Sequence, residues 1–215
     1  MSLDLIEFWK ARGPRHYKEF QDLSSEVKSR FTNQENETLK ILRKYRFSKI
    51  LELGCGFGRY TKILSQAFKP EKYVAVDLVK EQIENAKNYV GNDKIDYHCI
   101  PIQDFDMDEK FDLVFASEFL MHLNFETIED VIKKMVSFSS NKIVIVDWYD
   151  KTMFGKELRG YCFQHDYQTF FEKNNIKKFK AYPITYPFRT RLLGKYARMR
   201  GRRAPPPQAI IEIDV

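Results

Sequence analysis

The stretch of sequence that decides the fold of this chain reads Ile50-Leu-Glu-Leu-Gly-Cys-Gly-Phe-Gly-Arg-Tyr-Thr61. Its apolar first part predicts a buried strand, and the pattern that follows the last glycine predicts a helix. Gly54, Gly56 and Gly58 lie between the two. Glycines at such a turn let the chain bend sharply and bring backbone N–H groups next to a ligand, where a Cβ atom would intrude. The stretch therefore predicts a strand, a ligand-binding turn and a helix in succession.

A second apolar run, Tyr73-Val-Ala-Val-Asp77, ends in an acid that comes 19 residues after Gly58. In nucleotide-binding α/β sheets, an acid at about this distance ends the second strand and binds ribose hydroxyls. We therefore expect Asp77 to hold the ribose of a nucleoside cofactor. The dinucleotide fingerprint G-x-G-x-x-G would need a glycine where this chain has Arg59, so the pattern does not indicate a nicotinamide cofactor.

The glycine spacing G-x-G-x-G, preceded two residues earlier by Glu52, resembles the first motif of class I S-adenosylmethionine-dependent methyltransferases. The resemblance continues, with further motifs in order, from about residue 49 to residue 141. It implies S-adenosyl-L-methionine as the cofactor, and it implies that Asp104 faces the adenine amino group. Together with the crevice expected at the strand ends, it indicates these cofactor-binding residues: Glu52, Gly54, Cys55, Gly56, Gly58, Asp77, Leu78, Asp104 and Ser117.

Apolar runs alternate with amphipathic patterns after residue 48, which predicts a parallel sheet covered by helices on both faces. The expected strands are residues 49–53, 73–77, 95–100, 111–116, 142–147, 177–182 and 208–215. Methyltransferases of the class that the motif resembles insert an antiparallel final strand into the sheet. The expected fold is therefore α/β and doubly wound, with a mostly parallel seven-stranded sheet and an antiparallel last strand.

Three regions are expected along the chain. Residues 1–46 have helical periodicity and would form a lid, with Gly13-Pro14 separating a first helix from the next. Residues 47–215 would form the Rossmann-like domain. Within it, residues 183–207 would be a basic insertion between the last two strands.

Composition indicates the size of the domain and the cellular location expected for the protein. At 215 residues and 43% hydrophobic content, the chain suits one compact domain. No apolar run reaches the length of a membrane span, about 18 residues, and the N-terminus lacks the pattern of a signal peptide. The three cysteines are scattered and have no C-x-x-C spacing, which favours reduced thiols, no metal site and a cytoplasmic location.

Two histidines are candidates for a general base, which is needed only if the accepting group must lose a proton. His122 follows the expected fourth strand, and His165 precedes a helical pattern near the end of the fifth. Packing is the alternative for His122, and for His165 the alternative is a helix start capped by Asp166. The sequence lacks both the N/D-P-P-Y/F motif of the enzymes that methylate the amino groups of adenine, cytosine or glutamine amides and the carboxylate cluster of metal-dependent catechol methylation.

The methyl acceptor is harder to infer. Between Ala181 and Pro207 the chain has no acid, while seven basic residues fall within 189–203. Three interpretations remain open for this segment: a cap that attracts an anionic small molecule, a surface for nucleic acid, or an ordinary solvated face. We favour methyl transfer to an O or N atom of a small molecule. The alternatives are an RNA or protein methyltransferase docking through the segment, and an inert cofactor-binding module. Oligomeric state is not predictable.

Overall fold

The computed structural model describes residues 4–158, 160–186 and 207–215. Its helices are α1 (Leu5–Gln21), α2 (Ser25–Leu42), α3 (Arg59–Phe68), α4 (Lys80–Val90), α5 (Ile128–Phe138) and α6 (Tyr167–Lys173), with the short turns η1 (Leu120–His122) and η2 (Lys151–Met153). Its strands are β1 (Lys49–Leu53), β2 (Lys72–Asp77), β3 (Ile95–Cys99), β4 (Phe111–Ser117), β5 (Ser139–Trp148), β6 (Glu157–Leu158), β7 (Cys162–Phe163), β8 (Lys178–Pro183) and β9 (Gln208–Asp214).

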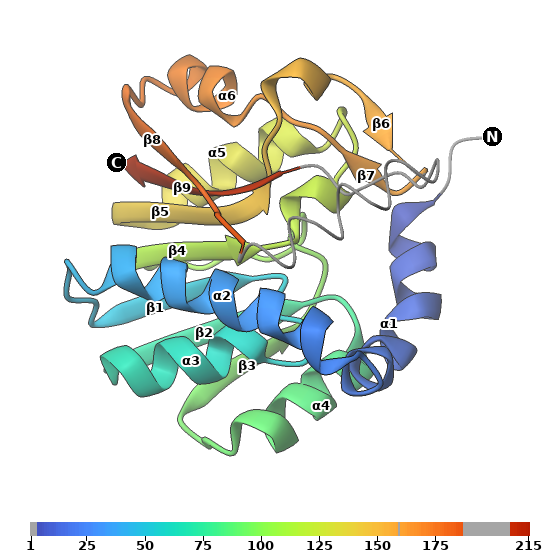
Figure 1. Cartoon of the computed structure of the whole chain (residues 1–215). Helices are drawn as coiled ribbons and strands as arrows, with labels where there is room; N and C mark the ends of the chain where they lie inside the picture. The colour runs from blue at the N-terminus through green and yellow to red at the C-terminus, as the bar shows by residue number, and fades with distance from the viewer. Residues whose placement is uncertain (1–3, 159, 187–206) are drawn as a thin grey trace.

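Seven of the strands form one sheet in the order β3-β2-β1-β4-β5-β9-β8 (Figure 1). The pairs from β3 through β5 are parallel, whereas β9 runs antiparallel to both of its neighbours, β5 and β8. The last strand thus inserts between two earlier ones, and the expected mostly parallel sheet with an antiparallel last strand is confirmed. The strand order reverses between β1 and β4, which is where open α/β sheets bind their ligands.

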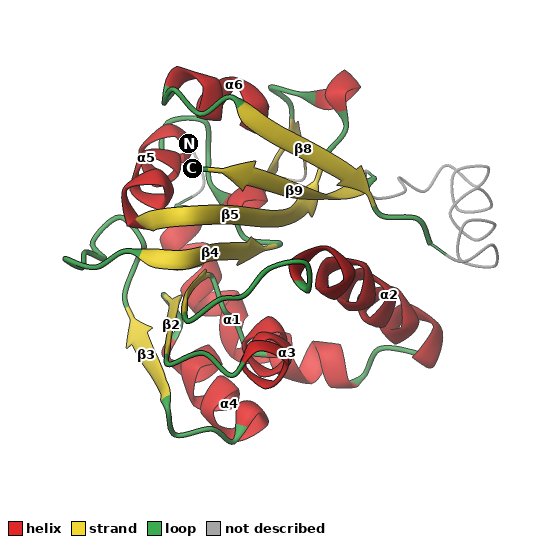
Figure 2. Cartoon of the chain, turned by 90° about the vertical axis from the view of Figure 1, so that its left-hand side faces the viewer, coloured by secondary structure: helices red, strands yellow, loops and turns green. Residues whose placement is uncertain are grey.

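The sheet is buried on both faces because its strands present apolar side chains to each side. Leu51 and Leu53 belong to the core beneath α5 and α6, whereas Ile50 belongs to the core beneath α2, α3 and α4. Figure 2 shows these two helical layers on opposite sides of the sheet. Alternation within a short strand therefore supplies both cores, as expected for a strand covered on each face.

The inserted strand β9 is held by a buried polar cluster as well as by apolar packing. Glu212 is 3% exposed, and its Oε1 accepts from Lys142 Nζ of β5 at 3.0 Å. Its other oxygen accepts from the hydroxyl of Tyr182 at 3.0 Å, and Tyr45 and Asp214 complete the cluster. The carboxylate is thus hydrogen-bonded as well as paired, which is what makes a buried charge tolerable.

Helix α1 differs from expectation. It begins at Asp4, whose side chain accepts from the N–H groups of Ile6 and Glu7, and it continues through Pro14 to Gln21. The predicted break at Gly13-Pro14 is therefore wrong. A proline inside a helix removes one hydrogen bond and usually bends the helix rather than ending it, and Figure 1 shows α1 changing direction. The break falls instead at Ser24, which caps α2 by accepting from Val27 N–H.

Two further sequence-based expectations concern the basic segment and the absence of membrane-spanning helices. The basic residues of the 189–203 segment lie outside the described residues, so the structure says nothing of their arrangement. Within the described ranges, every helix is too short or too polar to cross a lipid bilayer.

Candidate functional site

The turn after β1 has the backbone conformation that its glycines permit. Gly54, Gly56 and Gly58 all have positive φ angles, of 68°, 54° and 87°, a region that other residues rarely adopt. A Cβ atom on Gly54 would lie 2.5 Å from the ring of Phe119, while one on Gly56 would meet nothing within 4 Å. The turn therefore packs closely on one side and opens onto free space at Gly56.

Asp77, at the end of β2, closes this turn from the neighbouring strand. Its Oδ2 accepts from the N–H of Gly56 at 2.8 Å, and its Oδ1 accepts from the N–H of Val79 at 2.9 Å. Burial raises the pKa of this carboxyl, and the two backbone hydrogen bonds act in the opposite direction. Each carboxylate oxygen keeps a further lone pair, so Asp77 can still accept hydrogen bonds from a ligand.

Glu52 lies beneath the turn and is 2% exposed. Its Oε2 accepts from the hydroxyls of Thr61 at 2.6 Å and Tyr73 at 2.7 Å. Burial raises the pKa of this carboxyl to about 7, against the effect of these two bonds. Glu52 is therefore held by β2 through Tyr73 and by α3 through Thr61.

Arg59, the residue directly after the last glycine, connects the turn to helix α2. Its guanidinium donates to Glu35 at 2.9 Å and to Gln34 at 2.8 Å, both on α2, and to Glu118 at 3.2 Å. Glu118 follows β4 with a φ of 50°, which is unusual for a residue other than glycine. Its other oxygen accepts from the side-chain amide of Gln208 at 2.7 Å. One arginine thus joins α2, the turn and the end of β4.

Helix α1 covers the carboxyl ends of the strands on this side of the molecule (Figure 1). It approaches closely at Gly13, because a Cβ atom there would lie 2.7 Å from two methyl carbons of Val79. His16 Nδ1 and the amide nitrogen of Gln82 are 3.1 Å apart, which links α1 to α4. Burial lowers the pKa of His16. Helix α1 thus packs directly on the start of α4.

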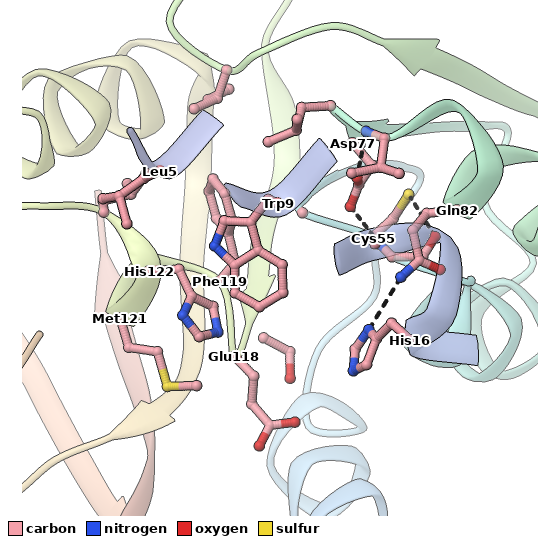
Figure 3. A pocket seen from close by; sticks show the side chains of 18 of the residues that line it. Leu5, Trp9, His16, Cys55, Asp77, Gln82, Glu118, Phe119, Met121 and His122 are labelled. Carbon is pink, nitrogen blue, oxygen red and sulfur yellow. Dashed lines mark hydrogen bonds between the residues drawn. The ribbon is translucent and has the colours of Figure 1, made fainter. Parts of the chain in front are cut away.

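His122 lies opposite this helix. Its ring centroid is 4.4 Å from that of Trp9 on α1 (Figure 3), and its Nδ1 lies 2.8 Å from the carbonyl oxygen of Tyr161. A carbonyl oxygen only accepts, so Nδ1 carries the proton and Nε2 is left as an acceptor. Burial lowers the pKa of His122 to about 4, which keeps the ring neutral at ordinary pH.

One cavity of about 520 Å³ joins these features. Of the residues expected at the site, it is lined by Glu52, Gly54, Cys55, Gly56, Asp77, Leu78, Ser117 and His122. It is also lined by Trp9, Arg12, His16, Gln82, Glu118, Trp148 and Tyr161. Of this second group, sequence analysis missed His16, Gln82, Glu118, Trp148 and Tyr161, which lie far apart in the chain and form no common motif.

Three expected site residues lie outside the lining of this cavity. Gly58 is the N-cap of α3, where a Cβ atom would lie 2.8 Å from Val90. Asp104 is exposed, and its neighbour Gln103 lines the cavity instead. His165 is 1% exposed, and its Nε2 lies 3.0 Å from the carbonyl oxygen of Leu123. This geometry gives His165 a packing position, with its ring against aromatic neighbours such as Phe125 and Phe163.

The residues around the turn fit an adenosyl cofactor. Gly56 offers open space beside a positive-φ backbone, and Asp77 offers carboxylate lone pairs for ribose hydroxyls. Two buried polar atoms on the cavity, Ser117 Oγ and Gln82 Oε1, have no hydrogen-bond partner among the described residues. Buried polar groups are nearly always satisfied, so these atoms point to a ligand. The described residues contain no group of three metal-ligating side chains.

Comparison with known proteins agrees with this geometry. Residues 50–140 match the family model described as a methyltransferase domain. Phosphoethanolamine N-methyltransferase 3 of Arabidopsis thaliana is 29% identical over 136 residues, covering 61% of this chain and 27% of the relative. A malonyl-[acyl-carrier protein] O-methyltransferase of Anoxybacillus flavithermus is 33% identical over 91 residues, covering 41% of this chain and 35% of the relative. The matches thus span about a quarter to a third of these relatives' length.

Solved structures match over nearly the whole chain. Magnesium protoporphyrin IX methyltransferase from Synechocystis PCC 6803, with bound SAM, has a TM-score of 0.72 at 12% identity and covers 99% of this chain and 98% of its own. The N-methyltransferase NodS from Bradyrhizobium japonicum, in complex with S-adenosyl-L-homocysteine, has a TM-score of 0.72 at 15% identity with the same coverage. The fold is that of class I S-adenosylmethionine-dependent methyltransferases. Residues 50–140, which match the methyltransferase-domain model, contain the glycine turn and Asp77.

Proposed function

We propose that this protein transfers a methyl group from S-adenosylmethionine to an O or N atom of a small molecule. The observation that carries the proposal is the extent of the cavity, which continues from the glycine turn and Asp77, past Glu118, to Trp9 and His122 beneath α1. Such a cavity has room for an acceptor beside the cofactor. A cavity of this size lies within the range of small-molecule sites.

Different residues would bind the cofactor, exclude water and accept a proton. The bound cofactor supplies a methyl group on a positively charged sulfur, which is already activated for displacement. Asp77 would hold the ribose hydroxyls, and the N–H groups of the glycine turn would face the methionine end. Helix α1 would exclude water and hold the acceptor in line, which is the main task in such a reaction. His122 Nε2 would take a proton where the acceptor must lose one.

A small-molecule acceptor is favoured because α1 encloses the far end of the cavity. The relatives named above act on phosphoethanolamine and on malonyl-[acyl-carrier protein], so relatives include both N- and O-methyltransferases. Docking of RNA or protein through residues 189–203 is the alternative.

The test is transfer of isotope-labelled methyl from S-adenosylmethionine in a cell extract that is separated into small molecules, nucleic acid and protein. We expect label in the small-molecule fraction, and much less label with the Asp77→Ala variant when S-adenosylmethionine is below saturation. Label in RNA or protein would support the alternative. A chain that ignores S-adenosylmethionine but binds a nicotinamide dinucleotide would refute the proposed function.

A further inference from the structure

The indole of Trp9 has a polar atom that the folded chain leaves unused. Trp9 is among the residues that line the cavity, and its Nε1 is buried without a hydrogen-bond partner among the described residues. In Figure 3 this nitrogen lies on the side of the indole that faces His122. An N–H donor buried without a partner costs free energy, so its presence beside a cavity points to a bound acceptor atom.

His122 presents the opposite kind of group at the same place. Because its Nδ1 donates to the carbonyl oxygen of Tyr161, its Nε2 offers a lone pair. The ring stays neutral, since none of the described carboxylates pairs with it and its neighbours include the rings of Trp9 and Tyr161 and the sulfur of Cys162. The acceptor end of the cavity therefore combines one fixed donor on α1 with one fixed acceptor on η1.

From this pair we infer that the methyl acceptor is a hydroxyl group, carried on a flat apolar molecule such as a phenol; the inference rests on the proposed function. A hydroxyl oxygen has one proton and two lone pairs. The proton can face His122 Nε2, one lone pair can accept from Trp9 Nε1, and the second lone pair stays free to attack the methyl carbon.

Two other acceptor groups fit less well. A neutral amine has a single lone pair, which must point at the methyl carbon, so a second N–H of the amine would face the N–H of Trp9. A carboxylate has no proton, so its lone pairs would face the lone pair of His122 Nε2. The amine would thus bring two N–H donors together, and the carboxylate would bring two acceptor atoms together. Either contact weakens binding when it is buried.

The walls of this part of the cavity are mostly apolar and aromatic. Phe119, Met121, Trp148 and Tyr161 line it together with Trp9. A flat ring would pack against such walls at low entropic cost. In the transfer step the C–O bond forms as the C–S bond breaks, the sulfur keeps the electron pair, and the hydroxyl proton passes to His122 Nε2 and then to water.

The test uses three probes that share one ring system: naphthol, naphthylamine and naphthoate, each substituted at the same ring position. The full chain is mixed with S-adenosylmethionine, and release of S-adenosylhomocysteine is measured for each probe. We expect methylation of naphthol to be at least about tenfold faster than that of either other probe. Equal or faster methylation of the amine or the acid overturns the inference.

A conservative variant, Trp9→Phe, keeps the aromatic packing and removes the N–H. We expect it to slow naphthol methylation about tenfold, to leave cofactor affinity unchanged, and not to slow naphthylamine methylation, because the N–H that opposes the amine is gone. An equal loss for all probes would mean that Trp9 only packs, and it would overturn the inference.

A measurement that does not depend on turnover is the indole N–H signal of Trp9 in NMR, assigned with the same variant. Naphthol added to the S-adenosylhomocysteine complex should shift this signal; no shift overturns the inference. A chain that does not bind S-adenosylhomocysteine at all refutes the proposed function itself, whereas binding with a preference for the amine overturns the inference alone.

Discussion

The N–H of Gly56 donates to Oδ2 of Asp77 across 2.8 Å, so the turn after β1 is tied to the end of β2. The same carboxylate that shapes the turn is the one that we propose binds the ribose. The two motifs are far apart in sequence, and this hydrogen bond brings them together.

Replacing Asp77 by alanine should therefore weaken cofactor binding by about ten- to a hundredfold, because it removes a buried charged acceptor and loosens the turn. Titration calorimetry with S-adenosylhomocysteine measures this. Asp104→Ala is the matched control: Asp104 is exposed and outside the cavity lining, and its removal should change affinity less than about twofold. Unchanged affinity in Asp77→Ala would refute the ribose assignment.

The close contact between Gly13 and Val79 predicts that Gly13→Ala displaces the lid. The new Cβ atom would lie 2.7 Å from two methyl carbons of a stiff, β-branched side chain. We expect faster proteolysis within α1 and faster dissociation of the cofactor. Val79→Ala, combined with Gly13→Ala, removes the clashing methyls and should restore both. If the double variant behaves like Gly13→Ala alone, the contact does not position the lid.

Loss of Arg59 should be costly, because Glu35 and Glu118 would be left without their partner in a largely buried place. Arg59→Met is expected to lower the free energy of unfolding by about 3–5 kcal/mol. Lys133→Met removes an exposed cation that pairs with Asp130, and it should have no measurable effect. Similar denaturant midpoints for the two variants would contradict the structural role given to Arg59.

Replacing the two candidate histidines should have different effects on turnover and on stability. His122→Phe keeps an aromatic ring but removes both ring nitrogens, and it should lower turnover by about a hundredfold or more without changing cofactor affinity. His165→Phe should keep turnover and lower only stability, since His165 is buried outside the cavity. Kinetics combined with thermal unfolding tests both. Loss of turnover in a folded His165→Phe protein would show that the packing position hides a catalytic role.

The buried histidines also predict a pH effect on stability. Burial lowers the pKa of both His122 and His165 to about 4, whereas an unfolded histidine titrates near about 6.5. Between these values the unfolded chain binds protons that the folded chain does not. Each histidine therefore stabilises the fold fully above about pH 6.5, and this contribution is lost as pH falls toward 4. NMR should find both rings neutral at pH values where free imidazole is charged; protonation near the ordinary pKa would contradict this.

The sheet could be predicted from sequence to within a few residues at most strand ends. The expected strand at residues 49–53 is β1 without change, while β5 begins at Ser139 rather than at residue 142. The difference arises because Ser139 pairs with Phe111 across a register shift, which is a contact between distant residues. The prediction of a helix break at Gly13-Pro14 was wrong because the buried contact of Gly13 with Val79 outweighs the local cost of a proline.

What the sequence determined by itself is the class of fold and the cofactor turn, because both depend on local rules. Glycine spacing sets the backbone of the turn, and alternating apolar runs set the strands and their coverage. The tertiary structure alone decided which histidine faces the cavity and which of its ring nitrogens carries the proton. That outcome depends on the carbonyl of Tyr161 and on burial under Trp9, and neither relationship between such distant residues is encoded in a local pattern.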